Sequence, residues 1–320
     1  MSGYVRQMDG TRAVVIEWLL DSDPAIRWQA LRDLTDAAPA VIAGERARIP
    51  STGWGAALLS LQQPDGNWGG GAYSPKWTST TYTLLLLRHF GPDPDDERVR
   101  RATERVRDRV TMGGGPFFEY REETCIAGMV LSLGATFRVD REASTAVAEW
   151  LLAEQLPDGG WNCRTRQGST RSSFHTTISV LEGLLDLQVW LDHRRSAAVD
   201  TARRRGEEYL LERRLMFRKA TGELVDPRWR LFSFPPRWHY DVLRGLDHLR
   251  AAGRRPDDRW AEAVGLVESK RTGDGRWLLQ NRYAGREHFP LEDGPGKPSR
   301  WNTLRALRVL RWYRSDGQPT

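Results

Sequence analysis

Side chains that can bind metals or transfer protons gather at the starts of several helical segments of this sequence. Carboxylates, thiols and imidazoles coordinate zinc or act as general acids and bases. Aromatic side chains, which can pack on a hydrophobic ligand and stabilise a cation, accompany them. The set comprises Trp77, Thr78, Glu123, Cys125, Phe174, His175, Trp238, His239, Asp241, Trp301 and Asn302. These residues can form one site only if the fold brings their segments together.

A repeated turn is the strongest indication of that fold. The segments 58–70, 151–163 and 267–279 each read as the end of a helix followed by Asp-Gly-x-Trp, beginning at Asp65, Asp158 and Asp274. Glycine permits the left-handed conformation that ends a helix, aspartate binds the freed amides, and tryptophan covers the joint between units. The pattern predicts a helical hairpin repeated along the chain.

Two kinds of helix alternate around these turns. Helices apolar on more than one face are expected at 78–91, 122–135, 173–187, 238–253 and 301–313. Helices rich in arginine and glutamate, with one apolar stripe, are expected at 97–110, 141–155, 196–215 and 258–270. Two more, at about 11–20 and 24–36, are expected to cap one edge. The alternation predicts an all-α protein with an inner and an outer layer, although a linear solenoid would give a similar pattern.

These segments resemble the repeats of the terpenoid cyclase and protein prenyltransferase superfamily, of the squalene-cyclase and prenyltransferase beta-subunit type. The resemblance covers roughly residues 52–313. It implies an α/α toroid of about five to six outer/inner hairpins around a central, largely apolar cavity. We therefore expect one domain over 1–320, with capping helices in about 1–45. Since catalytic and non-catalytic proteins share this fold, it does not fix the reaction.

The resemblance also implies a zinc site. Prenyltransferase beta subunits bind zinc through Asp-x-Cys at one inner helix start and a histidine at the next. Glu123 and Cys125 match the first element and His175 the second, one repeat later. Three such ligands leave tetrahedral zinc a fourth position for a thiol substrate. Glutamate in place of aspartate departs from the family, and a buried apolar thiol with a core histidine is the structural alternative.

The remaining candidates concern proton transfer and the cavity wall. His239 and Asp241 are predicted as a catalytic acid–base pair or further metal ligands. The residues expected to line the substrate cavity are Trp77, Thr78, Phe174, Arg237, Trp238, Trp301 and Asn302. Arg237, with Lys76, would attract an anionic group at the rim. The alternative for the aromatic residues is that they only fill a wide ring.

Asp93-Pro94-Asp95-Asp96 spells the Asp-x-Asp-Asp with which some cyclases protonate a double bond. Its equivalents before later outer helices also hold aspartate next to the expected helix start. We therefore predict that this cluster caps a helix. Glycine- and proline-rich stretches at 69–75 and 282–298 are expected to form loops over the cavity mouth.

Composition limits the class of protein. The net charge of +6 is carried mainly by arginine and suits an anionic substrate or weak peripheral contact with acidic lipid, whereas no nucleic-acid motif accompanies it. No apolar run is long enough to span a bilayer, and no secretion signal is recognised, so we expect a cytoplasmic protein. Two cysteines are too few for a disulfide framework.

The resulting hypothesis is a prenyltransferase- or cyclase-like transferase or isomerase. It would take a hydrophobic small molecule, such as an isoprenoid diphosphate, and depend on zinc. The alternative is a non-catalytic toroid that binds a lipid or a protein partner.

Overall fold

The computed structural model describes residues 10–188 and 193–315, without the side chains of 193–196 and 315. The predicted domain ends at 1–9 and 316–320 lie outside the described residues. Helices dominate, and the one sheet among the described residues is a small antiparallel pair, β1 (Thr111–Met112) and β2 (Gly115–Pro116). The all-α prediction is confirmed.

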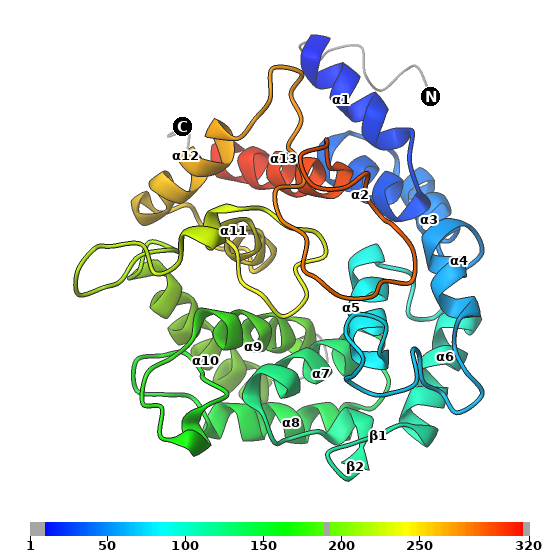
Figure 1. Ribbon diagram of the computed structural model, residues 1–320, viewed down its shortest axis with the longest axis vertical. Coiled ribbons are helices and arrows are strands. Elements are labelled where there is room, and N and C mark those ends of the chain that lie inside the picture. The colour runs from blue at the N-terminus through cyan, green and yellow to red at the C-terminus, as the bar shows by residue number, and fades with distance from the viewer. Residues whose placement is uncertain (1–9, 189–192, 316–320) are drawn as a thin grey trace.

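The helices form two concentric layers, as Figure 1 shows. The outer layer contains α1 (Gly10–Leu20), α4 (Gly53–Ser60), α6 (Glu97–Arg109), α8 (Arg141–Ala153), α10 (His193–Leu211) and α12 (Ala261–Ser269). The inner layer contains α2 (Pro24–Leu34), α5 (Thr80–Phe90), α7 (Thr124–Thr136), α9 (Phe174–Leu187), α11 (Val242–Ala251) and α13 (Arg300–Ser315). The short α3 (Pro39–Arg46) joins the first two pairs. Burial follows this division, since α5 is buried over most of its length and α6 along one stripe.

The N-terminal helices close the ring instead of capping one edge. Arg300 at the start of α13 donates to the carbonyl oxygens of Trp18 and Asp21. Arg308 donates to the Gln29 side chain of α2 at 3.1 Å. The first and last helices therefore meet, and the chain is an α/α toroid, not an open solenoid.

The Asp-Gly-x-Trp turns have the same structure three times. The glycines Gly66, Gly159 and Gly275 have φ of 87°, 94° and 81°, the left-handed region that only glycine enters freely. Each tryptophan indole donates to the carbonyl oxygen ten residues earlier at 2.7 Å, in the pairs Trp68–Leu58, Trp161–Leu151 and Trp277–Val267.

Each of these tryptophans also connects to the next inner helix. Its backbone N–H donates to a threonine hydroxyl in the first turns of that helix, at 3.1, 3.0 and 3.0 Å, in the pairs Trp68–Thr80, Trp161–Thr177 and Trp277–Thr303. The turn therefore fixes both the end of an outer helix and the start of an inner helix. This is how a local sequence motif positions residues at the inner helix starts.

The acidic cluster before α6 has the predicted capping role. Asp96 is the N-cap of α6 and accepts from the Arg98 N–H at 2.9 Å. Asp95 forms an exposed ion pair with Arg138. Asp140, at the equivalent position before α8, accepts from the Ala143 N–H. The contacts of Asp96 and Asp140 satisfy helix-end amides.

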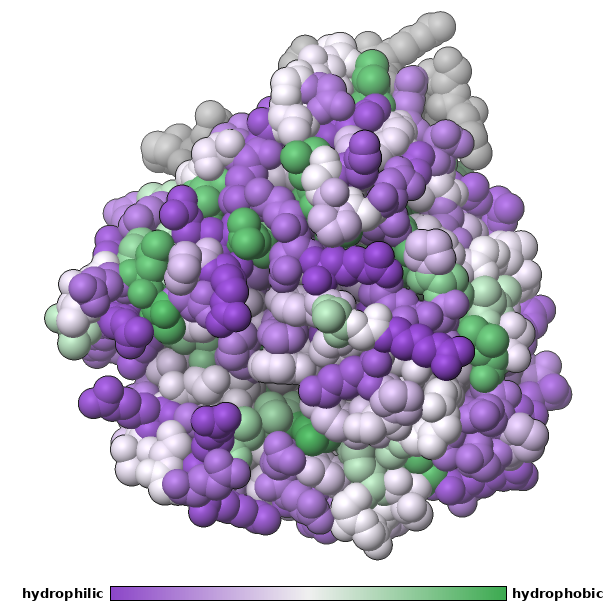
Figure 2. Space-filling view, viewed as in Figure 1, coloured by the Kyte–Doolittle hydropathy of each residue, from purple (hydrophilic) through white to green (hydrophobic). Residues whose placement is uncertain are grey.

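A long loop after α12 crosses the end of the ring where the inner helices begin (Figure 1, orange). The carbonyl of Arg286 accepts from the Trp77 N–H at 2.9 Å, and His288 contacts the Thr83 hydroxyl at 2.8 Å. Figure 2 shows a mainly hydrophilic face with small, separate hydrophobic areas. Among the described residues, no helix is long and apolar enough to cross a membrane.

Candidate functional site

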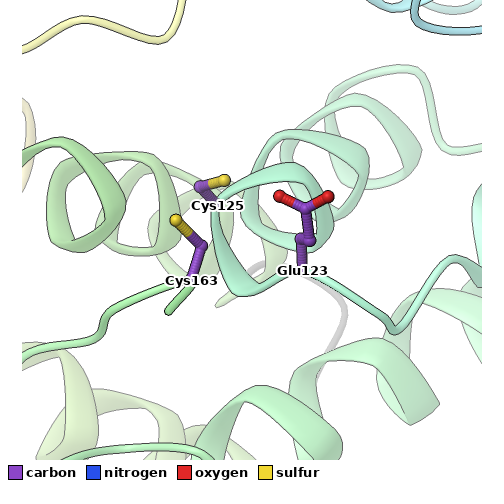
Figure 3. Close-up of side chains that lie close together, drawn as sticks. All are labelled: Glu123, Cys125 and Cys163. Atoms are coloured by element: carbon purple, nitrogen blue, oxygen red, sulfur yellow. The ribbon is translucent and has the colours of Figure 1, made fainter. Parts of the chain in front are cut away.

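Two thiols and a carboxylate meet where α7 begins. Glu123 directly precedes α7, Cys125 lies in its first turn, and Cys163 lies in the loop that leads to α9. One ligand atom from each lies within 4.8 Å of the others. Figure 3 shows the two sulfur atoms close together, with the Glu123 carboxylate at the same end of the helix. Glu123 is exposed and the cysteines are partly buried, so the group is accessible from solvent.

Close packing of α7 on α9 brings these residues together. A Cβ on Gly128 of α7 would lie 2.7 Å from the Val180 nitrogen, and one on Gly183 of α9 would lie 2.5 Å from the Gly128 carbonyl oxygen. The two helix backbones are therefore in direct contact. The Cys163 N–H donates to Thr176 Oγ1 at 3.3 Å, which places its thiol beside the start of α7.

The two thiols differ in acidity. The hydrogen bond from the Cys125 thiol lowers the pKa of Cys163 to about 6, and the Thr176 hydroxyl acts in the same direction. The same hydrogen bond and burial raise the pKa of Cys125. Cys163 is therefore the more readily ionised sulfur, and a thiolate is the form that binds metals.

His175, the third ligand predicted from the sequence, is not part of this group. Its Nδ1 accepts the backbone N–H of Tyr240 at 2.8 Å, and its ring stands edge-on to Trp229 and Trp238. Burial lowers the pKa of His175 to about 4. The structure therefore brings Glu123 and Cys125 together with Cys163, while His175 belongs to a neighbouring aromatic cluster.

His239 and Asp241 occupy different environments. The His239 ring lies between Trp238 and Tyr283, with a centroid distance of 3.7 Å to each. Burial, followed by the effect of His175, lowers the pKa of His239 to about 3, so the imidazole is neutral at pH 7.

The Asp241 carboxylate caps the start of α11. It is the N-cap of α11, accepts from the Arg244 N–H at 2.8 Å and from the Ser233 hydroxyl at 3.2 Å, and is 1% exposed. These contacts are those of a capping residue. One contact is made by each carboxylate oxygen, and neither contact involves His239.

The residues predicted to line the cavity fall into two groups. Trp77 stands edge-on to His239 and Tyr283, and the buried Arg237 guanidinium lies over Trp77 and pairs with Glu287 at 2.8 Å. Phe174 and Trp238 border the same cluster, Phe174 against Trp229 and Trp238 against His175. The Thr78 carbonyl accepts from the Thr83 hydroxyl nearby.

Trp301 and Asn302 lie apart from that cluster. Trp301 stacks on Phe234 at 4.2 Å and on Phe90 at 5.9 Å. The Asn302 amide donates to the carbonyl oxygens of Phe232 and Leu278. Both residues are buried.

Sequence reasoning missed Cys163 as a member of the thiol–carboxylate group, and also three tyrosines of the aromatic cluster around Trp77 and His239. Tyr82 donates to the Tyr73 hydroxyl at 2.8 Å, and Tyr283 stacks on His239. The repeat itself held a signal for Cys163, because the equivalent positions after the other turns are Gly70 and Leu279. A thiol that replaces these residues is a departure from the repeat.

A cavity lies where the inner helices end. The cavity measures about 310 Å³ and has a charged lining that includes Arg88, Glu182, Arg244, Asp247, Arg305 and Arg308. The resemblance had implied a largely apolar cavity, whereas this one is polar. Its charge makes it unsuitable for the tail of a hydrophobic ligand.

Comparison with known proteins supports the fold. No protein-family model matches the chain, and no curated protein does so either. Among solved structures, a polysaccharide lyase is similar over 97% of this chain and 100% of its own, with a TM-score of 0.53 and 11% sequence identity. At this identity the likeness shows a shared helical architecture, not a shared reaction.

Proposed function

We propose that Glu123, Cys125 and Cys163 bind Zn²⁺ at the amino-terminal end of α7. The observation that carries the proposal is the convergence of two thiols and a carboxylate within 4.8 Å. Sulfur and carboxylate oxygen are both zinc ligands, and three protein ligands are typical of sites that leave one position open. The lowered pKa of Cys163 favours the thiolate that binding requires.

The function that best fits such a site is that of a zinc-dependent enzyme. Bound zinc would supply a Lewis acid that lowers the pKa of a substrate thiol or of water. The Tyr73 hydroxyl, which accepts a hydrogen bond from Tyr82, keeps its own proton free to donate. Burial raises the pKa of Tyr73 to about 12, so this phenol acts as a hydrogen-bond donor at neutral pH.

The aromatic cluster beside the thiols favours a hydrophobic substrate of the isoprenoid type. The Nζ of Lys76 lies 5.7 to 5.8 Å from the ring centroids of Tyr73, Trp77 and Trp238. This arrangement offers an apolar surface next to one positive charge. A hydrocarbon chain could lie on the rings, and its anionic head group could pair with the ammonium. The reaction class would then be transfer or cyclisation.

Metal content tests the zinc site most directly. Purified protein is expected to hold about one zinc per chain, and Cys163→Ser is expected to lose it. His175→Asn is the matched control, because the asparagine oxygen can replace Nδ1 as the acceptor for the Tyr240 N–H. It should keep the metal. Zinc lost in His175→Asn but kept in Cys163→Ser would support the ligand set implied by the family resemblance and refute ours.

Ligand binding tests the substrate class. We expect an isoprenoid diphosphate to quench tryptophan fluorescence, and Trp238→Ala to weaken that binding more than tenfold. A toroid that binds zinc but no isoprenoid would disprove this part of the proposal. Because the fold resembles that of a polysaccharide lyase, a polysaccharide is the comparison ligand.

A further inference from the structure

The cavity at the carboxyl-terminal end of the inner helices is rich in arginine. Its volume is about 310 Å³, enough for a small molecule. Six arginines and three carboxylates line it: Arg32, Arg88, Arg244, Arg250, Arg305 and Arg308, with Glu182, Asp186 and Asp247. Asp33, just outside the lining, pairs with Arg32 and Arg308. Cations outnumber anions even when this fourth carboxylate is counted.

The carboxylates of the lining already form ion pairs with arginine, whereas several guanidinium N–H groups make no hydrogen bond with the described residues. Asp247 forms ion pairs with Arg250, Arg305 and Arg308. Glu182 accepts two hydrogen bonds from Arg244, at 2.8 and 2.9 Å. A guanidinium carries five N–H donors. Among the described residues, Arg250 and Arg305 each donate one side-chain hydrogen bond, to Asp247 and to the Ser233 carbonyl. Both therefore have donors left for a ligand.

Neutralisation of helix ends does not account for all of these arginines. Inner helices end here, and Arg88 and Arg250 lie in last turns, where a cation offsets the helix dipole. Arg244, however, lies in the first turns of α11, and Arg305 lies well before the end of α13. Their side chains are only 4% and 6% exposed, yet they border the cavity. Their charge is thus placed at the ring axis.

His248 adds a polar atom to this wall. Its Nε2 lies 3.2 Å from Glu207, and its buried Nδ1 has no hydrogen-bond partner among the described residues. That nitrogen is fully buried, so it lies behind the cavity surface and is not a contact for a ligand. The cavity itself combines spare guanidinium donors with excess positive charge.

We infer that this cavity is a binding site for a small, multiply charged oxyanion. Arginine forks match the paired oxygens of phosphate and carboxylate groups, and two or more guanidinium groups favour an anion with more than one charge. The site is separate from the thiol–carboxylate group, which lies at the opposite ends of the same helices. The inference does not depend on the proposed zinc function. It makes anion binding the role of the polar half of the ring.

Calorimetric titration of the full chain with sodium pyrophosphate and with citrate, at low salt, tests this inference. We expect at least one of them to bind, and we expect Arg250→Gln and Arg305→Gln each to weaken binding at least tenfold. Arg101→Gln removes the same charge from the exposed face of α6 and should leave affinity unchanged. Circular dichroism shows whether each variant folds, and Arg250→Gln, with the more exposed side chain, is the milder change.

The outcomes separate this site from the zinc site. Binding of pyrophosphate alone, of citrate alone or of both supports the inference and identifies the head group preferred. Titration of Cys163→Ser guards against capture of either anion by bound metal, and affinity should persist there. The inference fails if neither anion binds at millimolar concentration, if the two cavity variants bind as wild type does, or if binding disappears in Cys163→Ser.

Discussion

Two buried histidines at one end of the inner ring and a buried glutamate at the other end differ in whether they carry a charge. At the amino-terminal end, His175 and His239 pack against aromatic rings and form no hydrogen bond or ion pair with a carboxylate of the described residues, and burial lowers their pKa values to about 4 and about 3. At the carboxyl-terminal end, burial acts to raise the pKa of Glu182, but Arg244 and Arg88 outweigh it and lower the pKa to about 2. The two histidines at one end are thus kept neutral, whereas Glu182 at the other end is kept charged.

This difference shows how one architecture can carry two kinds of site. An ionisable group without a charged partner loses its charge in an apolar environment, as the two histidines do. Such an environment suits a hydrophobic ligand. Groups arranged in networks keep their charge, which suits an ionic ligand. The same six inner helices provide both environments, because their two ends carry different residues.

The largest expected effect comes from breaking the charged end. Glu182→Gln should lower the free energy of unfolding by about 3 kcal/mol, since it leaves the nearly buried Arg244 without its bidentate partner. Urea denaturation at pH 7 measures this change. A loss below about 1 kcal/mol would mean that the network is solvated, and the comparison between the two ends would collapse.

An intermediate effect should separate the two ends by pH. A histidine whose pKa is lowered by folding gives stability that is present above its unfolded pKa near 6.5 and is lost as the pH falls toward 4. Glu182, also with a lowered pKa, loses its contribution below the unfolded value near 4.5, as the pH approaches 2. Acidification should therefore remove the contribution of His175 and His239 before that of Glu182.

His175→Asn isolates this first step. The variant keeps an acceptor for Tyr240 but cannot take up a proton, so its loss of stability between pH 6.5 and 4 should be smaller than that of wild type by about 1 to 2 kcal/mol. Only the slope with pH counts, because the substitution has its own cost at neutral pH. Parallel curves for the two proteins would show that His175 titrates normally.

The smallest expected effect is that of Glu123→Gln. Glu123 is exposed, and its side chain forms no ion pair or hydrogen bond with the described residues, so stability without metal should change by less than about 0.5 kcal/mol. It is also the matched control for Glu182→Gln. A destabilisation comparable to that of Glu182→Gln would contradict the contrast between a preformed charged network and an open ligand group.

Much of the fold could be predicted because its determinants are local. The turns at Gly66, Gly159 and Gly275 need a left-handed glycine, and the indoles reach back only ten residues. The inner helices are recognisable by apolar residues on several faces. Closure through α2 and α13 was not predicted from the first forty residues, because contacts such as Arg308 with Gln29 join the two ends of the chain.

The site was predicted less well for the same physical reason. Family spacing selected His175, one repeat after Cys125, but the backbone N–H of Tyr240 occupies its Nδ1. Cys163 reaches the group because Gly128 and Gly183 allow α7 and α9 into backbone contact. Neither effect can be read from the spacing of residues along one helix.

By itself, the sequence determined the kind and approximate position of most helices, the three tryptophan turns and the capping aspartates, because each depends on residues within about a dozen positions of one another. Only the tertiary structure decided which side chains share a site and which end of the ring is charged. Those depend on close approach between helices far apart in the chain, where a single backbone hydrogen bond or a missing Cβ decides which groups meet.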